Sequence, residues 1–138
     1  MPNHCYQSIE VRGPRAMVHY LFHELTEHKR FCDAVIPLPL ESVADSYNWC
    51  WDNWGVKWDV AEAEVTNDLQ DHGVEKDGDA WFSFRCWTAW GPPVPVWERL
   101  HALGVEVHAE YQDEGMMFEG EFSDGENVSW EPEFKEEA

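Results

Sequence analysis

Carboxylate side chains recur at alternate positions in the C-terminal half of this chain, a spacing that suits electrostatic binding. Glu106 and Glu110 fall on one side of a predicted strand, and Glu119 and Glu121 share one side of the next. Alternate strand residues lie about 6.6 to 6.8 Å apart, so paired strands would hold these carboxylates in regular rows. Such rows can imitate the phosphates of a nucleic acid. The predicted contact set also includes four acids at the adjoining turns: Asp113, Glu114, Asp124 and Glu126.

The net charge of the chain is −19, and it is concentrated toward the C-terminus. Residues 59–138 hold 21 of the 28 acidic side chains and four of the nine Lys and Arg side chains. A small domain needs a net charge of magnitude about 2 to 8 for solubility. The excess favours a functional acidic surface, and the alternative is that charge only protects edge strands from aggregation. Direct binding to nucleic acid or to an anionic membrane is electrostatically unfavourable, so we expect a basic partner.

Tryptophans form a second candidate site. The connection at 47–60 contains four of the nine Trp residues and could fold over the sheet face that carries Trp81 and Trp87. Rings left exposed could instead stack on a base, a sugar or a methylated cation. The residues of this alternative ligand pocket are Trp54, Lys57, Trp58, Arg85, Trp87 and Trp90.

The spacing of histidine and cysteine matches no established metal or nucleophile motif. His19 and His23 are four residues apart, but after His23-Glu24 the helical zinc motif requires histidine where this chain has Glu27. The four cysteines include no C-x-x-C pair, and Cys86 alternates with phenylalanines in a way that predicts a buried thiol. We therefore expect no metal, no cofactor and no enzymatic activity, and the alternative is a metal-dependent hydrolase that binds its metal at the helix face of His19 and His23.

The elements that must position these groups follow from hydrophobic periodicity. Alternating apolar residues predict strands, and apolar residues at a spacing of 3.6 predict helices. The turn around Asp124-Gly125 predicts a hairpin. The expected strands are 4–12, 31–36, 80–90 and 105–111, the expected helices are 14–28 and 95–103, and the hairpin strands are 116–123 and 127–131.

This order of strands and helices predicts an α+β fold of the ferredoxin-like type. It is a split βαβ sandwich in which two helices lie on one face of an antiparallel sheet, and the C-terminal hairpin extends the sheet. We expect a single domain at 1–131, with an aromatic insertion at 40–79 and the hairpin within 116–131, followed by an acidic tail at 132–138.

Several short motifs occur in an order that resembles a known family. They are Met1-Pro2-Asn3-His4, Val11-Arg12-Gly13, Ile36-Pro37-Leu38-Pro39, Trp54-Gly55-Val56-Lys57-Trp58-Asp59 and Thr88-Ala89-Trp90-Gly91-Pro92-Pro93. With these motifs the chain resembles the YubB-type ferredoxin-like family of phage and plasmid proteins. The resemblance implies a ferredoxin-like fold and an origin in a mobile genetic element. It implies no catalytic residues.

From these observations we expect a non-enzymatic phage or plasmid protein that acts in the host cytoplasm. It would bind a basic host protein that handles nucleic acid, as a DNA mimic, and would inhibit a defence system such as CRISPR or restriction. The alternative is a module that binds a nucleotide or sugar through the Trp pocket. The sequence leaves open whether the chain forms a homodimer.

Overall fold

The computed structural model describes residues 4–37, 39, 46–72 and 78–131. The elements in chain order are β1 (His4–Pro14), α1 (Arg15–His28), α2 (Cys32–Val35), α3 (Ser46–Trp54), β2 (Ala61–His72), β3 (Asp79–Ala89), α4 (Val94–Ala102), β4 (Glu106–Asp113), β5 (Glu119–Ser123) and β6 (Glu126–Trp130).

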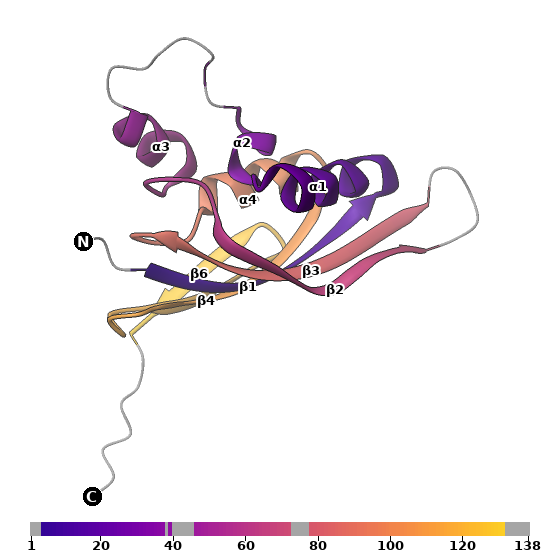
Figure 1. Cartoon of the computed structure of the whole chain (residues 1–138). Coiled ribbons are helices and arrows are strands. Elements are labelled where there is room, and N and C mark those ends of the chain that lie inside the picture. Colours follow the sequence, from indigo (N-terminus) through magenta and orange to yellow (C-terminus); the bar gives the residue numbers. More distant parts are fainter. Residues whose placement is uncertain (1–3, 38, 40–45, 73–77, 132–138) are drawn as a thin grey trace, which may run out of the picture.

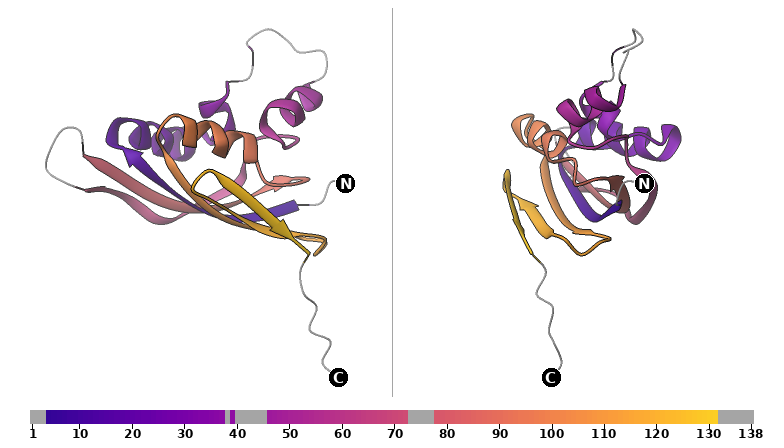
Figure 2. Two further views of the ribbon diagram at one scale, coloured as in Figure 1. Left: turned by 180° about the vertical axis from the view of Figure 1, so that it is seen from behind. Right: turned by 90° about the vertical axis from the view of Figure 1, so that its left-hand side faces the viewer.

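The strands form one six-stranded antiparallel sheet in an α+β fold, and the helices lie on one side of it (Figure 1). The strand order is β2-β3-β1-β4-β5-β6. Because β1 and β2 are both antiparallel to β3, they are parallel to each other, and β3 lies between them. Seen from behind and from the side, the other face carries no helix among the described residues (Figure 2). We call these two sides the covered face and the open face.

The covered face is apolar because successive strand residues point to opposite sides of the sheet. In β4, Val107, Ala109 and Tyr111 are buried, and the residues between them are exposed. Trp97 of α4 is fully buried, and its ring packs against Tyr111 and Phe122 at centroid distances of 6.1 and 5.5 Å. Burial of large apolar side chains stabilises the fold by about 1.5 to 3 kcal/mol each. The core therefore lies between this face and the helices.

Most of the predicted elements are confirmed within a few residues. These are the strands at 4–12, 80–90 and 105–111, the helices at 14–28 and 95–103, and the hairpin at 116–131. The acidic tail at 132–138 lies outside the described residues.

The strand predicted at 31–36 is wrong, because this segment contains α2. The Asp59 carboxylate accepts the backbone N–H groups of Phe31, Cys32 and Asp33 at 2.8 to 3.2 Å. These donors have no partner within a helix, so the distant carboxylate satisfies the start of α2. Local periodicity carries no information about a cap supplied from another part of the chain.

The missing strand is β2, which lies inside the segment predicted as an aromatic insertion at 40–79. It is an edge strand, and none of its described side chains is fully buried. Its pairing with β3 shifts register at three points. An exposed edge strand needs few apolar residues, so the acidic composition of β2 concealed it.

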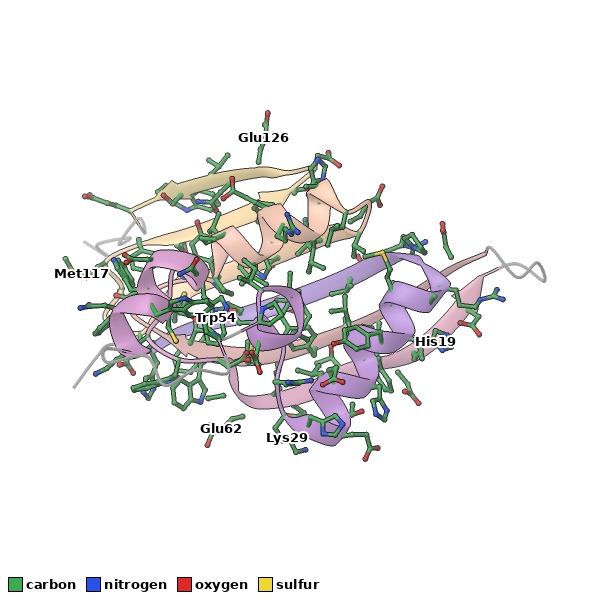
Figure 3. All side chains as sticks on the ribbon, turned by 90° about the horizontal axis from the view of Figure 1, so that it is seen from above. His19, Lys29, Trp54, Glu62, Met117 and Glu126 are labelled. Atoms are coloured by element: carbon green, nitrogen blue, oxygen red, sulfur yellow. The ribbon has the colours of Figure 1, made fainter. Side chains whose placement is uncertain are left out.

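The predicted tryptophan cover of the open face is also wrong. The helix α3 lies with the other helices on the covered side (Figure 1). Trp54 is 3% exposed, and its indole Nε1 donates to the backbone oxygen of Ile36 at 2.8 Å. Figure 3 shows Trp54 among the helices. The connection thus completes the core, and its described residues do not cover the open face.

The hairpin is fixed to the rest of the sheet through a glycine. Gly120 of β5 lies directly opposite Tyr111 of β4, and a Cβ atom at this position would overlap the Tyr111 ring and hydroxyl. The absence of a side chain lets the Tyr111 hydroxyl pass over β5 and donate to Asn127 Oδ1 of β6 at 2.6 Å. One side chain therefore links three strands.

Candidate functional site

Two neighbouring rows of side chains cross the open face perpendicular to the strands. Residues that are directly opposite in the register of adjacent strands make up each row. One row is acidic and contains Glu64, Arg85, Ser8, Glu110 and Glu121. The other is rich in aromatic rings and contains Trp87, Tyr6, Gln112, Glu119 and Trp130.

These rows line a groove of about 840 Å³ on the open face. The charged side chains along it are five glutamates and one arginine: Glu62, Glu64, Glu110, Glu119, Glu121 and Arg85. Tyr6 and Trp130 are 49% and 44% exposed, so their rings are accessible from solvent. The groove therefore combines a net negative charge with exposed aromatic surface.

An indole–carboxylate hydrogen bond lies at each end of the groove. Trp87 Nε1 donates to Glu62 Oε2, and Trp130 Nε1 donates to Glu119 Oε1, each at 2.7 Å. The His4 ring stacks on Trp87 with centroids 3.8 Å apart. Each bond satisfies the indole donor and fixes the orientation of a carboxylate, so a ring face and a negative charge are held next to each other.

Glu62 reaches Trp87 because β2 is irregular at this point. Its φ is +51°, in the left-handed region that non-glycine residues seldom occupy. The residue lies in the register shift between Ala61 and Glu64. A bulge redirects the side chain of the extra residue, and here it brings a carboxylate to the indole.

The strands β4 and β5 place two carboxylates in the groove that face each other. Glu110 of β4 and Glu121 of β5 are directly opposite in register. Like charges at such positions destabilise a sheet. His108 lies 4.0 Å from a carboxylate oxygen of each, and within the described part of the chain neither forms an ion pair with Lys or Arg. Folding does not require this arrangement, so the pair is a candidate for binding a cation.

The structure separates the eight predicted acidic residues into different regions. Glu110, Glu119 and Glu121 line the groove. Glu106 points to the open face as predicted, but it lies outside the groove and opposite Arg12 in the register.

The predicted role of Asp113 is wrong, because it points to the opposite face. It is 2% exposed, and its Oδ2 accepts the backbone N–H of Met117 at 3.2 Å. Glu114 accepts the backbone N–H of His4 at 2.8 Å and so joins the ends of β4 and β1.

Asp124 and Glu126 are exposed at the turn between β5 and β6, and neither lines the groove. The neighbouring Gly125 approaches His101 so closely that an added Cβ would be 2.6 Å from its ring. Figure 3 shows Glu126 at the periphery of the molecule. These acids are therefore placed toward α4 rather than at the groove.

The six residues of the alternative Trp pocket do not form one cavity. Only Arg85 and Trp87 line the groove, and Trp54 is buried in the core. Lys57 Nζ lies 5.3 Å from the ring centroid of Trp58 and 5.1 Å from that of Trp90, in a separate cation–π cluster.

Sequence reasoning missed several groove residues. The position of Tyr6 on the open face followed from the alternation in β1, but its proximity to the acids required the strand order. The pairing of Trp130 with Glu119 follows from the hairpin turn once the register is known. The sequence pattern did not indicate Glu62 and Glu64 as groove residues, because the strand that contains them, β2, was not predicted.

The thiols are buried, and His19 contacts an acid outside the groove. All four cysteines are buried, and Cys86 is a buried thiol as predicted. Removal from water is the main reason that the pKa of Cys5 is raised to about 12 and that the pKa of Cys86 is raised as well. His19 bonds Asp71 at 2.6 Å, and the described residues contain no group of three potential metal ligands.

Comparisons of the chain with protein-family models, with curated proteins and with solved structures found no match. Among the described residues, no helix is both long and apolar enough to cross a membrane.

Proposed function

We propose that this chain binds a basic protein that handles nucleic acid, and that the groove on the open face is the contact surface. The observation that carries the proposal is the opposed pair Glu110 and Glu121 between two indole–carboxylate pairs. Positive side chains of a partner would relieve the repulsion between these carboxylates. The chain would occupy the surface that the partner uses for phosphates.

The charge of the whole chain supports this proposal. The potential of a −19 protein attracts cationic surfaces and repels nucleic acid. A groove concentrates such a field, which speeds association and suppresses binding to acidic proteins. Since the ionic atmosphere screens charges beyond about 8 to 10 Å at physiological salt, we expect binding to weaken as salt rises.

The resemblance to YubB-type proteins leads to a narrower form of the proposal. In that form the partner is a nucleic-acid-binding component of a host defence system, and the chain inhibits it as a DNA mimic. We also propose that the unit from β1 to β4 is a ferredoxin-like domain. The strand order β2-β3-β1-β4 and the position of the helices on one face support this classification.

A charge-reversal experiment tests the proposed surface. Glu110→Lys with Glu121→Lys should weaken binding of a short Arg- and Lys-rich peptide by roughly tenfold or more at low salt, because attraction at the groove becomes repulsion. The matched control is Glu27→Lys with Glu98→Lys, which changes the net charge equally at exposed helix positions. Isothermal titration calorimetry gives each affinity.

Two results would contradict the proposal. If the wild-type chain does not bind the peptide, the groove does not capture basic segments. If the affinity of both double variants for the peptide falls by the same factor, only the total charge of the chain determines binding.

A competition experiment tests the mimicry directly. The wild-type chain and the control variant should release a labelled DNA duplex from the same peptide, and the groove variant should not.

A further inference from the structure

The open face already contains one arginine in contact with a tryptophan and a glutamate. The guanidinium carbon of Arg12 lies 5.6 Å from the centroid of Trp81, its cross-strand neighbour. Its Nη2 lies 3.8 Å from Glu10 Oε1, two residues earlier on the same strand. A guanidinium therefore fits between a ring in one row and a carboxylate in the next.

The Trp130 end of the groove has similar neighbours, and no arginine in the described part of the chain pairs with them. The acidic and aromatic rows are separated by about 6.6 to 6.8 Å along each strand. Trp130 lies directly opposite Glu119, and Glu121 follows two residues later on the same strand. A flat cation placed against the exposed Trp130 ring would lie within reach of both carboxylates.

We propose that the groove selects arginine over lysine in its partner, with the Trp130–Glu119 and Trp87–Glu62 pairs as two guanidinium subsites. This inference rests on the proposed function and specifies the partner's chemistry. A guanidinium has a planar, weakly hydrated face that stacks on indole and a fork of N–H donors that fits a carboxylate. The lysine ammonium is a compact, strongly hydrated charge and cannot make both contacts equally well.

The carboxylates of the groove already accept a guanidinium of this chain. Arg85 donates to Glu64 Oε2 through Nε at 3.0 Å and through Nη2 at 2.6 Å. This ion pair occupies one position in the acidic row. The Glu110–Glu121 pair and the two indole–carboxylate pairs remain for the partner.

The distance between the subsites limits the form of the partner. Trp87 is on β3 and Trp130 is on β6, four strand spacings apart, which corresponds to about 19 Å. An extended chain covers this distance in about six residues. The partner segment should therefore carry two arginines about six positions apart. Basic residues between them would contact Glu110 and Glu121.

Two peptides of equal length and charge test the preference. An extended peptide with arginines at all basic positions should bind about tenfold more tightly than its lysine counterpart, because two stacked guanidinium contacts are gained. Trp130→Ala should weaken the arginine peptide and leave the lysine peptide nearly unchanged. The matched control is Trp51→Ala, which removes an exposed tryptophan on α3.

Each outcome distinguishes the inference from the proposed function. Equal affinities of the wild-type chain for the two peptides would refute the arginine preference and leave the basic-partner proposal standing. Failure to bind either peptide would refute both. Trp130→Phe retains a ring face without the indole N–H, so it should keep more of the preference than Trp130→Ala. If the two variants lose the preference equally, stacking on residue 130 is excluded.

Discussion

The side chains of β4 lie in two contrasting environments. Toward the helices, Val107, Ala109 and Tyr111 are buried among apolar groups. Toward the open face, Glu106 and Glu110 alternate with His108 in solvent. Folding requires the first set, because burial drives the formation of the core. In the second set, Glu110 faces Glu121 of β5, and this like-charge pair weakens the sheet, so the demands of folding do not explain it.

The largest difference between the faces should appear when a ring is removed from each. Trp97→Ala should lower the free energy of unfolding by about 3 to 5 kcal/mol, because it leaves a cavity between α4 and the sheet. Tyr6→Ala on the open face should change it by only about 0.5 kcal/mol or less. Urea denaturation measures both, and similar losses would show that the open face also contributes to the core.

A smaller loss is expected from Gly120→Ala, which affects the Tyr111 link between β4, β5 and β6. The added methyl group would overlap Tyr111 and lie 2.6 Å from the backbone oxygen of Val128. We expect a destabilisation of about 1 to 3 kcal/mol. Tyr111→Phe in the Gly120→Ala background should cost less than it does in the wild type, because it removes the overlapping hydroxyl. Additive losses in this double-mutant cycle would contradict the proposed overlap.

Neutralising the opposed pair should separate stability from binding. Glu110→Gln with Glu121→Gln removes the like-charge repulsion and should stabilise the chain by about 0.2 to 1 kcal/mol. The same change should weaken binding of basic peptides and make the affinity less sensitive to salt. Thermal denaturation and calorimetry at several salt concentrations check this prediction. A double variant that is less stable than the wild type and binds the peptides with the same affinity would contradict it.

The smallest expected effect is a pH dependence at the periphery of the sheet. A hydrogen bond from His19 lowers the pKa of Asp71 below its ordinary value of 3.8. The ionised form therefore favours the folded state, so the contribution is present above about pH 4 and is lost as the pH falls through the lowered value. Asp71→Asn should flatten the acid limb of the stability curve, and Asp68→Asn is a control on the same strand. Identical curves for all three proteins would exclude this contribution.

The sequence predicts local features well and misses those that depend on distant residues. Alternation correctly predicts the strands β1, β3 and β4, and it places Val107 toward the core, where that side chain is buried. The helical turn at α2 depends on hydrogen bonds to Asp59, and the strand β2 forms through backbone pairing with β3. Neither interaction produces a periodic pattern of apolar residues in the sequence of the segment itself.

The same limit applies to the candidate site. Glu110, Glu119 and Glu121 were predicted from alternation, and the structure places them in one groove. Asp113 was assigned to the wrong side because its position in a turn was assumed, whereas β4 extends as far as this residue. Glu62 enters the groove through a backbone irregularity, which composition does not reveal.

The irregular pairing of β2 also makes the two borders of the sheet unequal. Three register shifts interrupt β2, whereas β6 pairs with β5 over five consecutive residues without a shift. A strand from another molecule needs a regular series of free N–H and C=O groups as a template, and bulges disrupt that series. Growth of the sheet by strand addition would therefore be confined to the β6 border, where a new strand would extend the aromatic row beyond Trp130.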